Sequence, residues 1–227
     1  MIILSLSIPH ELLALFPVRA QPTPALWEDV NTRDTKPTLW FVRHGESTWN
    51  ASGFVQGQAT GPVLTRKGRI EAAGVADRFG DAHIGSIYTS DLKRARETAE
   101  IVGCALGLAP ESNPALRERN FGKAQGRPHG ELVSAVSGIE RNRVVDADAR
   151  PEEGESLSEL YDRVRDFIIE LGTRAPGGDV LVVTHGGVIR VAQAYCSGIA
   201  VEAMNWGPVP NASVWRLVSR LHSDVVQ

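Results

Sequence analysis

Residues 39–50 read LWFVRHGESTWN, a strand-like apolar run that ends abruptly in polar residues. The run is continuously apolar rather than alternating, which predicts a strand buried on both faces of a sheet. It ends at Arg43 and His44, and the glycine that follows lets the chain turn sharply and come close to a ligand. Residues 180–187, VLVVTHGG, repeat this arrangement around His185. The two stretches therefore predict two central strands whose ends carry a site.

Outward from these two stretches, segments with strand and helix patterns alternate along the chain. Alternation of this kind predicts an α/β fold, a three-layer sandwich in which a mainly parallel central sheet is flanked by helices. The helix signal is clearest where Ser156 and Glu159 form a capping box ahead of an apolar stripe. The predicted strands are 38–44, 86–90, 179–185 and 212–219, and the predicted helices are 64–80, 91–107, 154–171 and 186–198.

The length of 227 residues suits one fairly large α/β domain. We predict an N-terminal extension at residues 1–37 and the domain at residues 38–227. The extension begins with an apolar stretch, but it lacks a basic start, so we interpret it as a surface segment rather than a signal peptide. Within the domain, residues 109–153 are rich in Gly, Pro and Arg and poor in pattern, which predicts a lid or side insertion.

The composition excludes several classes of partner. A formal net charge of −3 gives no basic field for nucleic acid, and no apolar run is long enough to span a bilayer. The two cysteines, Cys104 and Cys196, lie far apart and have no metal-ligand spacing. Free thiols of this kind are typical of a reducing compartment, so we predict a cytoplasmic protein.

The residues at the strand ends suggest an anion site. Ligands of open α/β sheets bind beyond the carboxyl ends of the strands, where His44 and His185 are predicted to lie. Arg43 supplies a planar cation suited to phosphate, and Arg94 follows the predicted strand at 86–90. A helix N-terminus after each glycine would add N–H donors, so phosphate is the simplest guest. Flanking arginines would repel a metal ion. From the residues alone, a surface or capping role for either histidine stays open.

The stretch VRHGESTWN resembles the signature of the histidine phosphatase superfamily, the phosphoglycerate mutase-like proteins. The resemblance covers about residues 38–218 and implies the three-layer fold of that family. Companion segments follow in the order of the family: FVQGQATGPVLTRKGRIEA, IYTSDLKRARETAEI, LRERNFGKAQG, GESLSELYDRV and VLVVTHGGVIR.

The resemblance implies a catalytic role for five residues. His44 is implied as the nucleophile that forms a phosphohistidine. Arg43, Arg94 and His185 are implied to bind the phosphoryl oxygens and stabilise their charge. Glu118 is implied to protonate the leaving oxygen and then to activate water. No metal and no other cofactor is needed, because the arginines and the second histidine supply positive charge.

A second set is implied to bind substrate or phosphate. Asn50 is implied as a hydrogen-bond donor to phosphate, with a helix cap as the less favoured alternative. Gln56 and Gly57 match loop positions that touch substrate, where a simple turn is the alternative. Arg119 matches a substrate-binding arginine of the mutases, and Gly186 follows the second histidine at the phosphate.

Within the family, the sequence favours a phosphatase over a mutase. The middle segment lacks the Lys-Trp-Arg-Arg type of run found in cofactor-dependent mutases, and THGG replaces their His-Gly-Asn. We predict a metal-independent phosphomonoesterase that hydrolyses a small phosphorylated metabolite, with a bell-shaped pH profile peaked on the acid side of neutral. The alternatives are a cofactor-dependent phosphoglycerate mutase and, less favoured, an inactive scaffold that binds a phosphorylated ligand. The resemblance also allows a homodimer.

The substrate itself is not readable from the sequence. Cations of the middle segment favour a substrate with a second anionic group, although a solvated surface is the ordinary interpretation of such a run. These cations are Arg127, His129, Arg141 and Arg143.

Overall fold

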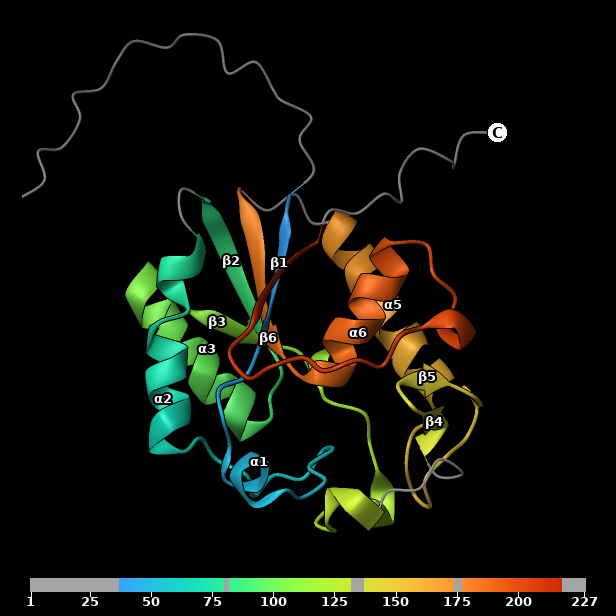
Figure 1. Ribbon diagram of the computed structural model, residues 1–227. Coiled ribbons are helices and arrows are strands. Elements are labelled where there is room, and N and C mark those ends of the chain that lie inside the picture. The colour runs from blue at the N-terminus through green and yellow to red at the C-terminus, as the bar shows by residue number, and fades with distance from the viewer. Residues whose placement is uncertain (1–36, 80–81, 132–136, 174–176, 218–227) are drawn as a thin grey trace, which may run out of the picture. The chain divides into compact units, whose positions relative to one another are not determined.

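The computed structural model describes residues 37–79, 82–131, 137–173 and 177–217 (Figure 1). The predicted extension, except Pro37, and the last residues of the predicted final strand lie outside the described residues. The boundary at residue 37 therefore stays a prediction. None of the helices in the described part of the chain is long and apolar enough to cross a membrane.

The centre of the fold is a five-stranded sheet in the order β3-β2-β6-β1-β7. Neighbouring strands are parallel except for β7, which runs antiparallel to β1 and forms one edge. This confirms the predicted mainly parallel sheet. The strands are β1 (Leu39–Arg43), β2 (Ile84–Thr89), β3 (Pro110–Ser112), β6 (Asp179–Thr184) and β7 (Val214–Leu217).

Helices cover both faces of this sheet, as Figure 1 shows with α2 and α3 on one side and α5 and α6 on the other. The longer helices are α1 (Thr48–Ser52), α2 (Arg66–Ala73), α3 (Lys93–Leu106), α5 (Leu157–Thr173) and α6 (Gly186–Cys196). Short 3₁₀ turns are η2 (Ala76–Phe79), η3 (Pro114–Leu116), η4 (Gly122–Ala124), η5 (His129–Glu131) and η6 (Val201–Ala203). The three-layer arrangement is thus confirmed.

Alternation along the central strands builds two cores. Phe41 and Val182 pack with α5 and α6, whereas Val42 and Val183 pack with α3 and the chain around Phe79. Successive side chains of a strand point to opposite faces, so a continuous apolar run serves both layers. Each such side chain, fully buried, stabilises the fold by about 1.5–3 kcal/mol.

Some predicted elements differ from the structure. The predicted helix at 64–80 is two pieces, because α2 stops before Gly74 and a 3₁₀ turn follows. The predicted capping box is present, since Ser156 Oγ accepts from the Glu159 N–H at 3.1 Å and the Glu159 carboxylate accepts from the Ser156 N–H at 2.9 Å. The pattern-poor segment 109–153 contains β3 and a two-stranded hairpin, β4 (Ile139–Glu140) and β5 (Arg143–Val144). Its movement as a lid stays a prediction.

Candidate active site

The register of two neighbouring strands brings the two predicted histidines together. Arg43 pairs with Thr184, so β1 and β6 end side by side, and the His44 N–H donates to the Thr184 carbonyl at 2.9 Å. The rings of His44 and His185 lie edge to face with centroids 5.2 Å apart. Both histidines are almost fully buried, at 2% and 0% exposure. The backbone pairing of the sheet therefore fixes the centre of the site.

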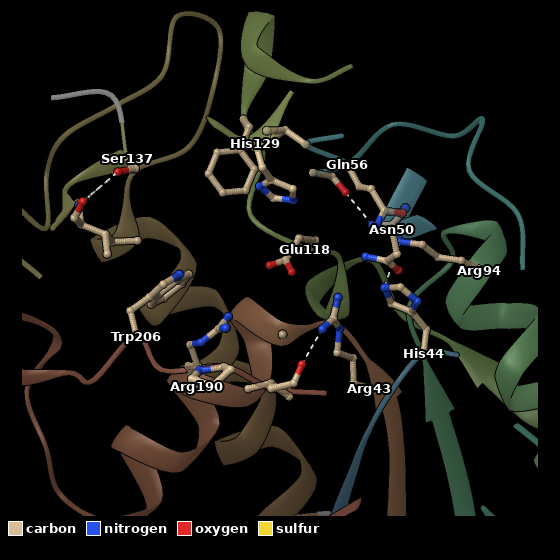
Figure 2. Close-up of a pocket in the computed structure, with 17 residues that line it drawn as sticks. Arg43, His44, Asn50, Gln56, Arg94, Glu118, His129, Ser137, Arg190 and Trp206 are labelled. Carbon is tan, nitrogen blue, oxygen red and sulfur yellow. Dashed lines mark hydrogen bonds between the residues drawn. The ribbon is translucent and has the colours of Figure 1, made fainter. Parts of the chain in front are cut away.

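A cavity of about 490 Å³ opens over these strand ends (Figure 2). Its volume suits a metabolite rather than a phosphate ion alone. The described residues contain no cluster of three or more His, Cys, Asp or Glu that could hold a metal ion. The cavity is lined by Arg43, His44, Asn50, Val55, Gln56, Gly57, Arg94, Glu118, Phe121, His129, Ser137, Ile139, Gly186, Arg190, Trp206, Pro208 and Val209.

The hydrogen bonds of His44 define its tautomer. Nδ1 lies 2.7 Å from the Gly45 carbonyl, which can only accept, so Nδ1 carries the proton and Nε2 carries the lone pair. Nε2 accepts from Arg94 Nε–H at 3.3 Å. Burial holds the pKa of His44 well below its ordinary value of 6.5, and the positive charges of Arg94 and Arg43 lower it further. His44 is consequently a neutral base with its lone pair at Nε2.

The peptide that accepts from His44 is itself held by a carboxylate. The Glu46 N–H, on the same peptide as the Gly45 carbonyl, donates to Glu71 Oε2 at 2.8 Å. A negative charge at the N–H end of a peptide polarises its carbonyl and strengthens the bond that this carbonyl accepts. Glu71 on α2 therefore acts on His44 through one peptide group.

Arg94 and Arg43 place positive charge beside Nε2. Arg94 is 1% exposed, and its guanidinium donates to the carbonyl of Gly57 at 2.7 Å and to that of Ala59 at 3.3 Å. Burial lowers the pKa of Arg94 to about 10, so it stays charged at neutral pH. Arg43 donates through Nη1 to the Val209 carbonyl, and its buried Nε has no acceptor among the described residues.

His185 adds a polar group beneath the cavity. Its two ring nitrogens are buried and have no hydrogen-bond partner in the described part of the chain. Burial holds the pKa of His185 well below 6.5, helped by the charge of Arg94 and by His44. The next residue, Gly186, begins α6 and lines the cavity, and a first helical N–H has no partner within its own helix. These groups, with the positive end of the α6 dipole, favour an anion.

Glu118 sits where two backbone N–H groups orient it. Oε1 accepts from the Arg119 N–H at 2.8 Å and Oε2 accepts from the Gly187 N–H at 3.1 Å. A Cβ on Gly187 would collide with Oε1, so glycine is required for this approach. Figure 2 shows the carboxylate between the His44–Arg94 side of the cavity and the Arg190–Trp206 side.

Two of the predicted site residues do not line the cavity: His185, which lies beneath it, and Arg119. Arg119 is fully buried, and its guanidinium donates to the backbone carbonyls of Ser137, Ala149 and Glu155. Adjacent residues of this irregular segment point opposite ways, with Glu118 inward to the cavity and Arg119 into the protein. These contacts give Arg119 a structural role, and its contact with substrate stays a prediction.

Asn50 and Gln56 line the cavity around a shared serine. Ser47 Oγ donates to Gln56 Oε1 at 2.7 Å, and Asn50 Oδ1 accepts from the Ser47 N–H at 3.2 Å. Ser47 is the N-cap of α1, and Asn50 completes its capping box while it also lines the cavity, so the two interpretations of the sequence are compatible. Gly57 adopts φ +49° and presents its carbonyl to Arg94.

Sequence reasoning missed part of the cavity wall, above all Arg190 and Trp206. Arg190 lies four residues after Gly186 on α6, and helical side chains lean toward the N-terminus of their helix. That spacing was the available signal. The predicted cations of the middle segment behave differently from one another. His129 lines the cavity, Arg141 and Arg143 line a separate one beside η6, and Arg127 lines neither.

Comparison with known proteins agrees with this site. The sequence profile of the histidine phosphatase superfamily (branch 1) matches residues 39–226. The chain belongs to this superfamily, as predicted, and its class of enzymes is the histidine phosphatases.

Two relatives and one solved structure illustrate the range of the family. Phosphoglycerate mutase-like protein 4 of Arabidopsis thaliana is 41% identical over 155 residues, which are 66% of each chain. A metal-independent phosphoserine phosphatase, also from Arabidopsis thaliana, is 34% identical over 197 residues, 82% of this chain and 78% of the relative. Proteins named as probable phosphoglycerate mutases are also among the relatives. A mycobacterial glucosyl-3-phosphoglycerate phosphatase superposes with a TM-score of 0.70 at 31% identity, covering 80% of this chain and 92% of that one.

Proposed function

We propose that the chain is a metal-independent phosphomonoesterase that hydrolyses a small phosphorylated metabolite through a phosphohistidine at His44. The observation that carries the proposal is the neutral, buried His44, whose Nε2 lone pair faces a cavity lined by Arg43 and Arg94. A neutral imidazole is the nucleophilic form, and the two cations match the two charges of a phosphate monoester.

In the first step, the Nε2 lone pair forms a bond to phosphorus while the bond from phosphorus to the leaving oxygen breaks. That oxygen keeps the bonding electron pair and takes the proton of the Glu118 carboxyl. Arg94 gives up its contact with Nε2 and, with Arg43 and the N–H of Gly186, bonds the phosphoryl oxygens. The ring then carries a positive charge, which the Gly45 carbonyl stabilises at Nδ1.

In the second step, a water molecule attacks phosphorus from the side that the leaving alcohol has vacated. The Glu118 carboxylate takes a proton from this water, and the phosphorus–nitrogen bond returns its electron pair to Nε2. One carboxyl group thus serves as acid and then as base, and its place between the two sides of the cavity supports this double role. Phosphate leaves and both residues recover their first state.

The mutase alternative loses its one favourable residue. Arg119 supports a mutase only if it contacts substrate, and its guanidinium is committed to the backbone carbonyls of Ser137, Ala149 and Glu155. The proposal therefore keeps the phosphatase, with phosphatases named among the relatives in support. We also propose a cytoplasmic location from the free thiols of Cys104 and Cys196. A homodimer and the absence of a nucleic-acid partner stay predictions.

The test is turnover of p-nitrophenyl phosphate with and without a chelator. We expect release of p-nitrophenol at a rate that the chelator does not change, and no turnover would favour the scaffold. A second assay supplies 3-phosphoglycerate with 2,3-bisphosphoglycerate. Free phosphate is the expected product, and 2-phosphoglycerate formed faster than phosphate would establish the mutase. The low pKa of His44 places the acid limb of the pH–rate profile below pH 6.5.

A further inference from the structure

Arg190 is a cation of the cavity wall that the proposed chemistry does not use. It projects from α6 on the side of Glu118 away from His44, next to Trp206 (Figure 2). Nη1 lies 3.1 Å from the position that a Cβ of Gly186 would take, so the absence of that atom makes room for the guanidinium. A leaving group that extends from His44 past Glu118 toward this side would meet Arg190.

The contacts of Arg190 hold it in place without neutralising it. Nε donates to the Gly207 carbonyl at 2.7 Å, and the guanidinium carbon lies 4.7 Å from the centre of the Trp206 ring. Among the described residues, no carboxylate forms an ion pair with it, and its Nη groups have no hydrogen-bond acceptor. Burial lowers the pKa of Arg190 to about 10, so it is charged at neutral pH. A fixed cation with an open Nη fork is suited to a carboxylate.

A count of charge in the cavity points to one more anionic group. Among the described residues that line it, three are arginines and one is a glutamate. A phosphate monoester dianion matches Arg43 and Arg94, and in the proposed first step Glu118 carries the proton that it gives to the leaving oxygen. Burial and the charge of Arg43 lower the pKa of His129, so it adds no charge near neutral pH. One positive charge is then left, and it belongs to Arg190.

We propose that Arg190, stacked on Trp206, binds a carboxylate on the leaving group, so that the preferred substrates are phosphate esters of hydroxy acids. The proposal rests on the proposed phosphatase function and assigns it a substrate class. Apolar residues that also line the cavity, among them Ile139 and Val209, are available to contact the body of the substrate. A carboxylate supplies the one negative charge that the count requires, whereas a second phosphate dianion would leave an excess.

A competing explanation is that Arg190 only supports the loop that follows η6. That loop also carries Val209, whose carbonyl holds Arg43, so a purely structural Arg190 would affect all substrates alike. Recognition of a carboxylate would instead affect the two members of a matched substrate pair differently. The ratio of the rates for the two members of a pair therefore distinguishes the two explanations.

The experiment measures kcat/KM for two matched pairs of phosphate esters. The short pair is 3-phosphoglycerate and glycerol 3-phosphate, and the long pair is 6-phosphogluconate and sorbitol 6-phosphate. We expect the wild type to prefer the carboxylate member of at least one pair by about 10- to 100-fold, the value of a charged hydrogen bond to arginine. In Arg190→Met, which keeps an apolar contact with Trp206, the preference should fall to about one.

Three further measurements make the result decisive. Arg190→Lys keeps the charge without the planar fork and should retain part of the preference. Arg143→Met removes an exposed arginine that lines the other cavity and should retain all of it. Turnover of p-nitrophenyl phosphate reports folding and the proposed function separately. Equal loss for both members of a pair in Arg190→Met, or no preference in the wild type, would overturn the carboxylate assignment alone, and no turnover of any ester would remove both.

Discussion

The two ends of the cavity are built in different ways. The phosphate end consists of His44, Arg94 and His185, which are 2%, 1% and 0% exposed and follow directly from strand ends or a helix start. Apart from Arg190 on α6, the leaving-group end consists of residues such as His129 and Trp206, which lie in turns and loops and are exposed or half-buried. The first end has the backbone pairing of the sheet behind it, and the second does not.

The phosphate end is therefore suited to the chemistry, and the leaving-group end is suited to the selection of substrates. A displacement at phosphorus needs its nucleophile and cations fixed to within a fraction of an ångström, which parallel strands in register provide. A leaving group needs only a complementary wall, and loops can change that wall without disturbing the sheet. Relatives named as phosphatases of different substrates, on one fold, are what this arrangement allows.

Removal of the proposed nucleophile should have the largest effect of any single change. His44→Asn preserves the cavity but removes Nε2. We expect kcat to fall by about 10⁴-fold or more, as for other covalent nucleophiles. An acid-labile phosphoenzyme should be trapped from the wild type and be absent from the variant.

A matched histidine tests whether the loss is specific to the phosphate end. His83 precedes β2 at the opposite end of the sheet and is exposed, so His83→Asn should keep full activity. A phosphoenzyme that persists in His44→Asn would show that another residue is the nucleophile. The contrast between the two ends of the cavity would then fail.

The boundary between the two ends can be disturbed by one methyl group. Gly187→Ala puts a Cβ against Glu118 Oε1 and should displace the carboxylate, so we expect a loss of about 10²-fold for an alkyl phosphate. The loss should be smaller for p-nitrophenyl phosphate, whose leaving oxygen needs little protonation. Steady-state rates with the two esters measure the ratio.

A control for this change lies on α5. A methyl group at Gly172 would meet only open space, so Gly172→Ala should leave both rates as in the wild type. If Gly187→Ala slows both esters equally, Glu118 is not the acid for the leaving oxygen and the boundary lies elsewhere.

The same contrast explains how much the sequence could predict. His44 and His185 were found because an apolar run and a glycine are local patterns, and parallel strands align their ends by rule. That Arg119 lies outside the cavity lining could not be predicted, because an irregular segment carries no period that tells which of two adjacent side chains points inward. β3 was missed because Pro110–Ser112 contains no β-branched or aromatic residue.

The leaving-group end was harder to predict for a related reason. Trp206 and His129 come from separate loops, and only the folded chain shows that they meet at the cavity. Arg190 was accessible in principle, since its spacing from Gly186 places it over the first turn of α6. To find it, one has to know that side chains of α6 lean toward its N-terminus and that the site lies at this end of the helix.

A smaller effect tests the support behind the phosphate end. Glu71→Leu removes the acceptor of the Glu46 N–H and the charge that polarises the Gly45 carbonyl, so formation of the phosphohistidine should slow about tenfold. Glu71→Gln keeps an acceptor and should recover part of the rate. The Nδ1 proton resonance of His44 should move upfield in both variants.

A surface partner of Glu71 provides the control. Lys67 lies 3.6 Å from Glu71 Oε1 and its side chain is 67% exposed, so Lys67→Met should change neither the rate nor the proton resonance. A Glu71→Leu protein with a slow rate but an unmoved resonance would show that Glu71 affects only stability.

The smallest expected effect is on the pH dependence of the free energy of unfolding. A buried histidine that stays neutral contributes to this dependence, whereas a surface group with the same pKa in the folded and unfolded chain does not. His185 has its pKa held well below 6.5 by burial, so below about pH 6.5 the unfolded chain binds a proton that the folded chain does not. Stability must then fall as the pH drops, by up to about 1.4 kcal/mol per pH unit for this one group, until its folded pKa is reached. His185→Leu removes the group that takes up this proton, so the decline of stability with falling pH should be less steep.

Urea unfolding between about pH 7 and pH 5 measures the two slopes of stability against pH, for the wild type and for the variant. The buffer contains no phosphate or other anion that could hold the protonated ring. Equal slopes would mean that the folded protein also protonates His185, and the anion site would then carry more positive charge than the arginines supply.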